Sequence, residues 1–176
     1  PGDILITGAT DATINDTLTA VNDITVEATA GTLEQTAGDM LAGNDVTLDG
    51  GTAVVLGGTI GSGTSIGNDV LINQTLLGTV DVNGTIDADN NILIGTAGGG
   101  AVTITADVTA DNGAVGGLLT VLADDAINAS GALQGSDVTV ISTSDAVTVA
   151  LVTATGTGTP GDILITGATD ATINDT

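Results

Sequence analysis

Residues 22–26 read "NDITV", and close variants of this five-residue phrase recur along the whole chain. The other copies are "GDILI" at 2–6, "NDVTL" at 44–48, "NDVLI" at 68–72, "NNILI" at 90–94, "GLLTV" at 117–121, "SDVTV" at 136–140 and "GDILI" again at 161–165. In each phrase the third and fifth residues are aliphatic, an alternation typical of a β-strand with one buried face. The phrase therefore predicts one strand in each of eight successive segments.

The spacing of the phrases defines a short repeat inside a long one. Successive phrases begin 20, 22, 24, 22, 27, 19 and 25 residues apart, which makes seven units of about 23 residues in a period of 159. The first 17 residues, "PGDILITGATDATINDT", return letter for letter at 160–176. We interpret residues 1–159 as one full period and residues 160–176 as the start of the next. The chain is then expected to be a window on a longer tandem array.

Each unit contains further strand signals after its phrase. A second alternating run occupies residues 12–16, 53–60, 80–86, 101–108 and 146–152, and a third aliphatic position falls at Leu18, Met40 and Ile86. Gly, Asn-Gly and Asp-rich corners separate the runs, as turns require. This pattern predicts an all-β fold, a parallel β-solenoid of about seven coils per period, with each coil hydrogen-bonded to the next. The alternative is a sandwich of short antiparallel strands, which gives no reason for one phrase to recur at matching positions.

The composition excludes several classes of function. The chain has 22 acidic residues and no Lys, Arg, His, Cys or aromatic residue, so its net charge is −22. Such a chain repels nucleic acid, and no apolar run approaches the ~18 residues that a membrane span needs. The usual catalytic bases and nucleophiles are missing, which leaves only carboxylate pairs such as Asp124 with Asp125, or the "DADNN" stretch at 87–91. We expect no enzymatic activity.

The second residue of the phrase is acidic six times in eight. These residues are Asp3, Asp23, Asp45, Asp69, Asp137 and Asp162. Alternation points them outward, so they form a column of carboxylates along the shaft. Two interpretations remain open: each Asp caps its own backbone in a solvated turn, or Ca²⁺ or another divalent cation bridges neighbouring coils weakly. No other cofactor is expected.

The first and fourth residues of the phrase give two further predictions. Asn22, Asn44, Asn68 and Asn90 share the alternation of the buried residues, so we expect an inward ladder in which each amide bonds to the next. Leu71 and Leu93 fall on adjacent coils and point outward. They are candidates for a lateral contact with a second filament.

Five Asn-x-Thr/Ser sequons are candidates for glycosylation. They begin at Asn15, Asn73, Asn83, Asn128 and Asn174.

Three stretches carry a resemblance to a known family. "GDILITGAT" from residue 2, "AGNDVTLDGG" from residue 42 and "SDVTVIS" from residue 136 resemble coils of filamentous-haemagglutinin-type exoproteins and related bacterial β-helical adhesins. The resemblance implies a right-handed β-helix, secretion and a place at the cell surface. The expected function is a structural repeat of an extracellular filament, such as a stalk, matrix or sheath fibre. Its partners would be adjacent copies of the repeat, end to end and side by side. The alternative is the shaft of a surface adhesin that binds host or matrix glycans.

Overall fold

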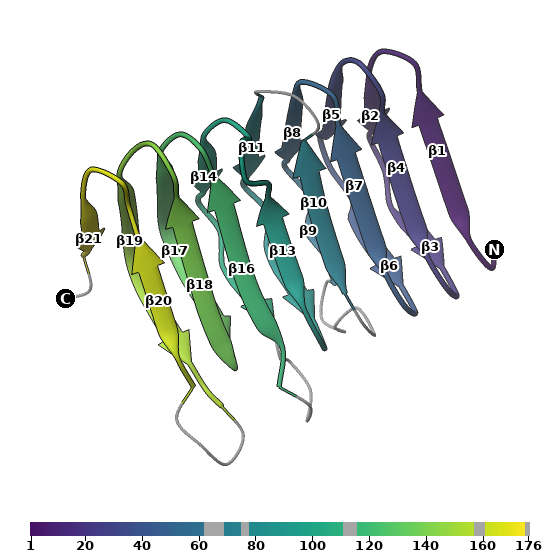
Figure 1. Ribbon diagram of the computed structural model, residues 1–176. Coiled ribbons are helices and arrows are strands. Elements are labelled where there is room, and N and C mark those ends of the chain that lie inside the picture. Colours follow the sequence, from purple (N-terminus) through teal and green to yellow (C-terminus); the bar gives the residue numbers. More distant parts are fainter. Residues whose placement is uncertain (62–68, 75–77, 111–115, 157–160, 175–176) are drawn as a thin grey trace.

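The recurring phrase forms one strand in every coil, and these strands lie side by side in a single parallel sheet (Figure 1). The computed structural model describes residues 1–61, 69–74, 78–110, 116–156 and 161–174. Asn68 of the expected asparagine ladder lies outside these residues. The eight strands of this first sheet are, in order, β1 (Ile4–Gly8), β4 (Ile24–Ala28), β7 (Val46–Gly50), β10 (Val70–Gln74), β13 (Ile92–Gly95), β16 (Leu118–Ala123), β18 (Asp137–Ser142) and β20 (Ile163–Thr166).

The register of the first sheet follows the phrase. The third residues of all eight phrases are partners of one another: Ile4, Ile24, Val46, Val70, Ile92, Leu119, Val138 and Ile163. The uneven spacings read from the sequence are therefore the lengths of the successive coils. The predicted parallel solenoid of about seven turns is confirmed.

Two further faces complete each coil. The second face contains β2 (Ala12–Ile14), β5 (Thr32–Gln35), β8 (Ala53–Leu56), β11 (Thr79–Val82), β14 (Val102–Ile104), the first part of β17 (Ile127–Gly135), the first part of β19 (Val147–Ala154), and β21 (Ala171–Ile173). The third face contains β3 (Leu18–Ala20), β6 (Asp39–Ala42), β9 (Thr59–Ile60), β12 (Ile86–Ala88), β15 (Val108–Ala110), and the later parts of β17 and β19. Since β17 runs through both faces, they form one hydrogen-bonded sheet.

The core is a continuous column of aliphatic side chains that runs the length of the shaft. Residues such as Ile24, Val46 and Ile72 are fully buried, and Met40 fills the same interior from the third face. Alanines line one column of that face: Ala20, Ala42, Ala88 and Ala110. Val, Ile, Leu and Ala, with Met40, thus fill the interior without an aromatic residue.

Tight corners bring the backbones of neighbouring coils into contact. A Cβ atom at Gly78 would overlap the carbonyl oxygen of Thr52, and one at Gly84 would overlap that of Gly58. Glycine is required at these positions because any side chain would push the coils apart.

The termini lie at opposite ends of the shaft (Figure 1). Among the described residues there is no helix of the length and hydropathy that crossing a membrane requires.

Candidate functional site: the acidic corner and the repeat seam

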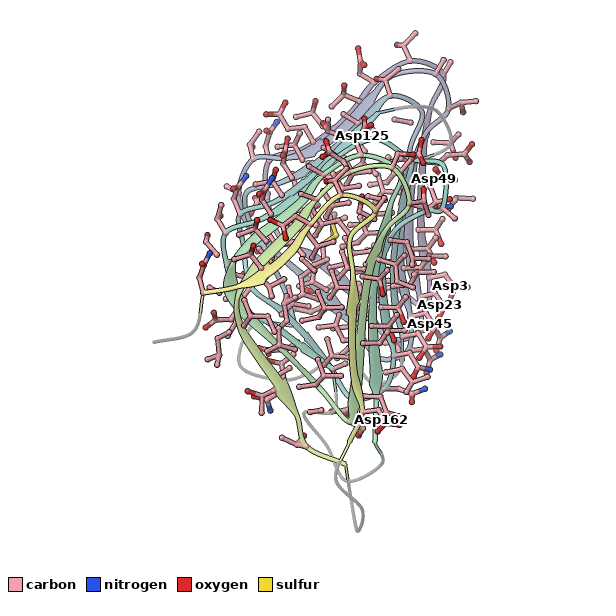
Figure 2. All side chains as sticks on the ribbon, turned by 60° about the vertical axis from the view of Figure 1, so that its left-hand side comes forward. Asp3, Asp23, Asp45, Asp49, Asp125 and Asp162 are labelled. Atoms are coloured by element: carbon pink, nitrogen blue, oxygen red, sulfur yellow. The ribbon has the colours of Figure 1, made fainter. Side chains whose placement is uncertain are left out.

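The acidic residue that six of the eight phrases contain lies where the chain enters the first sheet, just before the strand or, for Asp137, as its first residue. In Figure 2, Asp3, Asp23 and Asp45 follow one another along one edge of the solenoid. The carboxylates of the inner coils are half-buried, and only Asp3 and Asp162, in the first and last coils, are exposed. The predicted outward column is therefore present, and its members lie close to the backbone of their neighbours.

These side chains accept hydrogen bonds from the backbone of the following coil. Oδ1 of Asp23 accepts the N–H of Asp45 at 3.3 Å, and Oδ1 of Asp45 accepts the N–H of Asp69 at 3.2 Å. Oδ1 of Asp69 in turn accepts the N–H of Asn91 at 2.9 Å. Each donor is the residue that stacks directly on its acceptor. The column therefore joins one coil to the next through its side chains as well as through the strand ladders.

The same bond persists where the column loses its charge. Oδ1 of Asn91 accepts the N–H of Leu118 at 3.0 Å, so an amide oxygen serves in place of a carboxylate. Leu118 supplies no acceptor, and the bond returns between Asp137 and the N–H of Asp162 at 2.7 Å.

This geometry corrects one of the two interpretations of the acidic column. That interpretation has each Asp cap its own backbone, whereas Asp23, Asp45, Asp69 and Asp137 cap the backbone of the next coil. Hydrogen bonds to ionised acceptors are about twice as strong as neutral ones, which offsets the repulsion between stacked carboxylates. No group of three acidic side chains placed to hold a metal ion occurs among the described residues. Bridging by Ca²⁺ stays a prediction, and calorimetry with and without a chelator tests it.

Other corners use the same arrangement. The residue just before a strand on the second or third face accepts, through its side chain, the N–H of the residue stacked on it. The pairs are Asp11 with Thr32 at 2.9 Å, Asp107 with Ala132 at 2.8 Å, and Thr17 with Asp39 at 3.2 Å. These hydrogen bonds between coils were not predicted from the sequence, although an Asp or Thr directly before an alternating run indicates them.

The inward asparagine ladder is wrong. Asn22 and Asn44 are exposed and Asn90 is half-buried. Asn44 does stack on Asn22, but the bond between them is from the N–H of Asn44 to the carbonyl of Asn22 at 2.9 Å. The side-chain amides of Asn22 and Asn90 donate instead to carboxylates of the preceding coil, Asp3 at 3.0 Å and Asp69 at 2.8 Å. These residues precede the strand, so the alternation of the strand does not extend to them.

The two outward leucines are neighbours, as their positions in the phrase indicate. Leu71 and Leu93 are register partners in β10 and β13, and both are partly exposed on the outer surface of the first sheet. The lateral contact predicted for them stays a prediction.

The sequon asparagines differ in exposure. Asn15, Asn83, Asn128 and Asn174 are exposed, and Asn73 is half-buried in β10. Two of them accept hydrogen bonds from threonines one coil on. The pairs are Asn15 with the hydroxyl of Thr36 at 2.6 Å and Asn83 with that of Thr105 at 2.9 Å. Glycosylation itself stays a prediction.

The candidate catalytic carboxylates have contrasting environments. Hydrogen bonds from Thr143 and Ser144 lower the pKa of the Asp124 carboxyl, while Asp125 beside it is exposed. At Asp87, burial and then the charge of Asp107 raise the pKa of the carboxyl. A general acid needs a raised pKa and a partner across the reacting bond. The lowered pKa keeps Asp124 a carboxylate, so Asp124 itself is unsuited to the role of that acid.

A shallow groove of about 250 Å³ lies on the second face near the C-terminal end. It is lined by Thr103, Asn128, Ala129, Ser130, Thr148, Ala150 and Asn174. The lining carries hydroxyl and amide groups and no charge.

The two copies of the 17-residue sequence form the same strands. β20 and β21 begin 159 residues after β1 and β2. β20 pairs in parallel with β18, with Val138 opposite Ile163, and β21 pairs with β19, with Val147 opposite Ala171. The N–H of Val138 donates to the carbonyl of Asp162 at 2.9 Å, as the N–H of Ile4 donates to the carbonyl of Asp23 at the other end of the shaft. The same 17-residue sequence thus stacks on the seventh coil at one end of the shaft, and at the other end the second coil stacks on it.

No protein-family model, curated protein or solved structure matches this chain.

Proposed function

We propose that the chain is a structural repeat of an extracellular filament, a stalk, matrix or sheath fibre built as a continuous acidic β-solenoid. The observation that carries the proposal is the seam between coils seven and eight. Residues 161–174 stack there in register and form the same strands as residues 1–17, and the N–H of Asp162 donates the corner bond to Asp137. A sequence that can follow the last coil of one period and precede the second coil of another allows the shaft to continue without a break.

The charge supports a role as a hydrated fibre. The period of residues 1–159 holds 19 acidic residues, which are the 22 of the chain less Asp162, Asp170 and Asp175. Seven coils rise about 34 Å at the usual strand spacing, so the shaft carries about one negative charge per 1.8 Å, close to the density of duplex DNA. Such a rod repels other rods of the same charge in low salt, and it binds cations. The absence of Lys and Arg also removes trypsin sites, which suits a protein outside the cell.

The groove on the second face favours one alternative, the shaft of a surface adhesin. Hydroxyl and amide groups such as those of Asn128, Ser130 and Thr148 are the kind that bond to sugar hydroxyls. Binding of the chain to an array of neutral glycans, lost on Asn128→Ala with Ser130→Ala, would support this alternative.

Chains of one, two and three periods, each closed by residues 160–176, test the filament proposal. Electron microscopy at low salt is expected to show rods that lengthen by about 34 Å for each added period. Rods that instead widen at constant length, or separate globules joined by linkers, would contradict the proposal. The mass of the native subunit after full denaturation then distinguishes one long polypeptide from stacked copies, because hundreds of kilodaltons indicate the first and tens the second.

A further inference from the structure

The outer surface of the first sheet changes character halfway along the shaft. In coils two and three its outward residues include Glu27 and Asp49, which are register partners. From coil four onward the outward residues between the corners carry no charge. Each of these five coils has at least one large outward aliphatic residue, and one from each coil belongs to what we call the neutral stripe: Leu71, Leu93, Leu122, Ile141 and Leu164.

The residues of the neutral stripe lie in two neighbouring columns of the sheet, with Leu71, Leu93 and Leu164 in one column and Leu122 and Ile141 in the next. Leu71 pairs with Leu93, and Leu122 pairs with Ile141, one coil on. Between the two pairs lies Gly95, the register partner of Leu122, where a Cβ atom would overlap the carbonyl oxygen of that leucine. The first four residues of the stripe are partly exposed and Leu164 is 51% exposed. The surface between the corners is therefore uncharged across five strands, and Thr120 and Thr139 separate Leu93 from Leu164 within their column.

The other faces of the same coils differ. Most of their outward residues are polar, with Thr103, Asn128 and Thr148 on the second face and Thr109 and Gln134 on the third, while Leu151 on the third face is an exposed aliphatic side chain. The acidic residues near the neutral stripe stand at the corners, where Asp69 and Asp137 accept backbone N–H groups of the next coil. Within the part of the chain that the structure describes, several large outward aliphatic side chains thus combine with an absence of charge on the first sheet of these coils.

We propose that the neutral stripe is the surface through which a second copy of this chain packs side by side with the first, sheet against sheet. The inference rests on the proposed filament. The charge identifies the occupant: with 22 acidic residues and no Lys, Arg or His, two copies repel wherever their acidic corners meet. A partner with basic residues would bind those corners instead. Two neutral stripes can approach to the roughly 10 Å of packed sheets while the corners remain in water.

The area of the neutral stripe sets the strength of the contact. Five strand spacings by a five-residue strand give about 400 Å², roughly half of the ~800 Å² per partner that a stable complex buries. One period is therefore too small to pair firmly. In an array the stripe recurs every ~34 Å on the same face, so that pairing strengthens with each added period through effective concentration. Bundling is expected to depend steeply on filament length and to need salt, which screens the corners.

A three-period chain in about 1 M salt, where screening acts within about 3 Å, tests the proposal. Leu71→Thr with Leu93→Thr and Leu122→Thr in every period is expected to raise the concentration at which rods bundle by at least about tenfold. Threonine already occupies the column of Leu71 and Leu93 at Thr25 and Thr47, and the column of Leu122 at Thr166, so the strands should persist. The matched control is Leu41→Thr with Val55→Thr, which removes partly exposed aliphatic side chains from the other two faces. The control should bundle like the original chain.

A second variant tests the surface without removing any leucine. Thr120→Asp with Thr139→Asp introduces charge beside the neutral stripe at register partners in β16 and β18, and should also prevent bundling. Bundling unchanged in both variants, or lost equally in the control, would overturn the proposal.

Rod width in electron micrographs reports the lateral contact, and rod length reports the continuity of the filament. Long single rods from the leucine variant, with bundles from the original chain, are the expected result. Rods that fail to lengthen with added periods would instead contradict the filament.

Discussion

At the residue scale, a side-chain acceptor placed one residue before a strand joins successive coils. Asp45 shows the arrangement, since it donates its own N–H to Asp23 and accepts that of Asp69. Asn91 performs the same role without a charge. The hydrogen bond, and not the charge, is therefore what the coil needs at this position.

Asp45→Ala is expected to reduce the free energy of unfolding by about 1 kcal/mol, because the half-buried N–H of Asp69 loses its acceptor. Asp45→Asn keeps an oxygen in place and removes one negative charge from the column, so its stability should equal or exceed that of the original chain. Denaturant unfolding followed by circular dichroism measures both. A loss in Asp45→Asn as large as that in Asp45→Ala would show that the charge, and not the acceptor, matters.

The sequence identified these residues but not their partners. The period-two alternation correctly places Ile24 and Val26 in the core, because both lie within β4. Extended backwards to Asn22 it fails, because the chain bends there before the strand begins. Hydrogen bonds between coils join residues some 20 positions apart, such as Asp11 with Thr32. They become visible only once the register is known.

At the element scale, the outer surface of the first sheet brings like charges together. Glu27 and Asp49 are partners in β4 and β7, and Oδ1 of Asp49 is buried with no hydrogen-bond partner. Burial, and then the charge of Glu27, raise the pKa of the Asp49 carboxyl above its ordinary value. In the unfolded chain this carboxyl regains its ordinary pKa.

The folded chain consequently binds a proton at Asp49 at a higher pH than the unfolded chain does. Stability is expected to rise as pH falls from neutral through the raised pKa of Asp49 to its ordinary value near 3.8. Asp49→Asn should raise the melting temperature at neutral pH and flatten this rise. Asp125→Asn, which removes one charge from an exposed corner, is the control. Equal slopes in Asp49→Asn and the original chain would contradict the assignment.

Substitutions at the buried positions of each strand are expected to lower stability the most. Ile72 is fully buried in β10, whereas its neighbour Leu71 points outward. Ile72→Ala is expected to cost about 2–5 kcal/mol, because the surrounding coils cannot close the cavity. Leu71→Ala should cost about 1 kcal/mol or less. Equal losses in the two variants, measured by denaturant unfolding, would contradict the inward and outward assignment.

The strands of the second face show where the alternation of aliphatic residues fails to predict a strand. The run 146–152 indicates β19 correctly, whereas the run 53–60 covers two strands on different faces, β8 and β9. β5 is missed because Gln35 takes the inward place after Leu33, where its amide donates to the carbonyl of Gly38 at 3.0 Å. β17 is missed because small residues from Ala129 to Ala132, where its register with β19 shifts, dilute the pattern. In both cases stacking on regular neighbours maintains the strand.

At the scale of the whole molecule, the long repeat and the short repeat are parts of one structure. Seven uneven coils make a period, and the eighth begins with the same residues and the same strands as the first. The register of Val138 with Ile163 across the seam is of the same kind as that of Ile4 with Ile24 within the period. A fibre built from such periods needs no separate joint.

X-ray diffraction from an oriented multi-period fibre tests this continuity most directly. We expect a strong meridional reflection near 4.8 Å that indexes as the seventh order of an axial repeat of about 34 Å. Its presence would place strands across the axis in seven rungs per period. A fibre whose strand spacing lies on the equator, or whose meridian shows no repeat near 34 Å, would contradict the account.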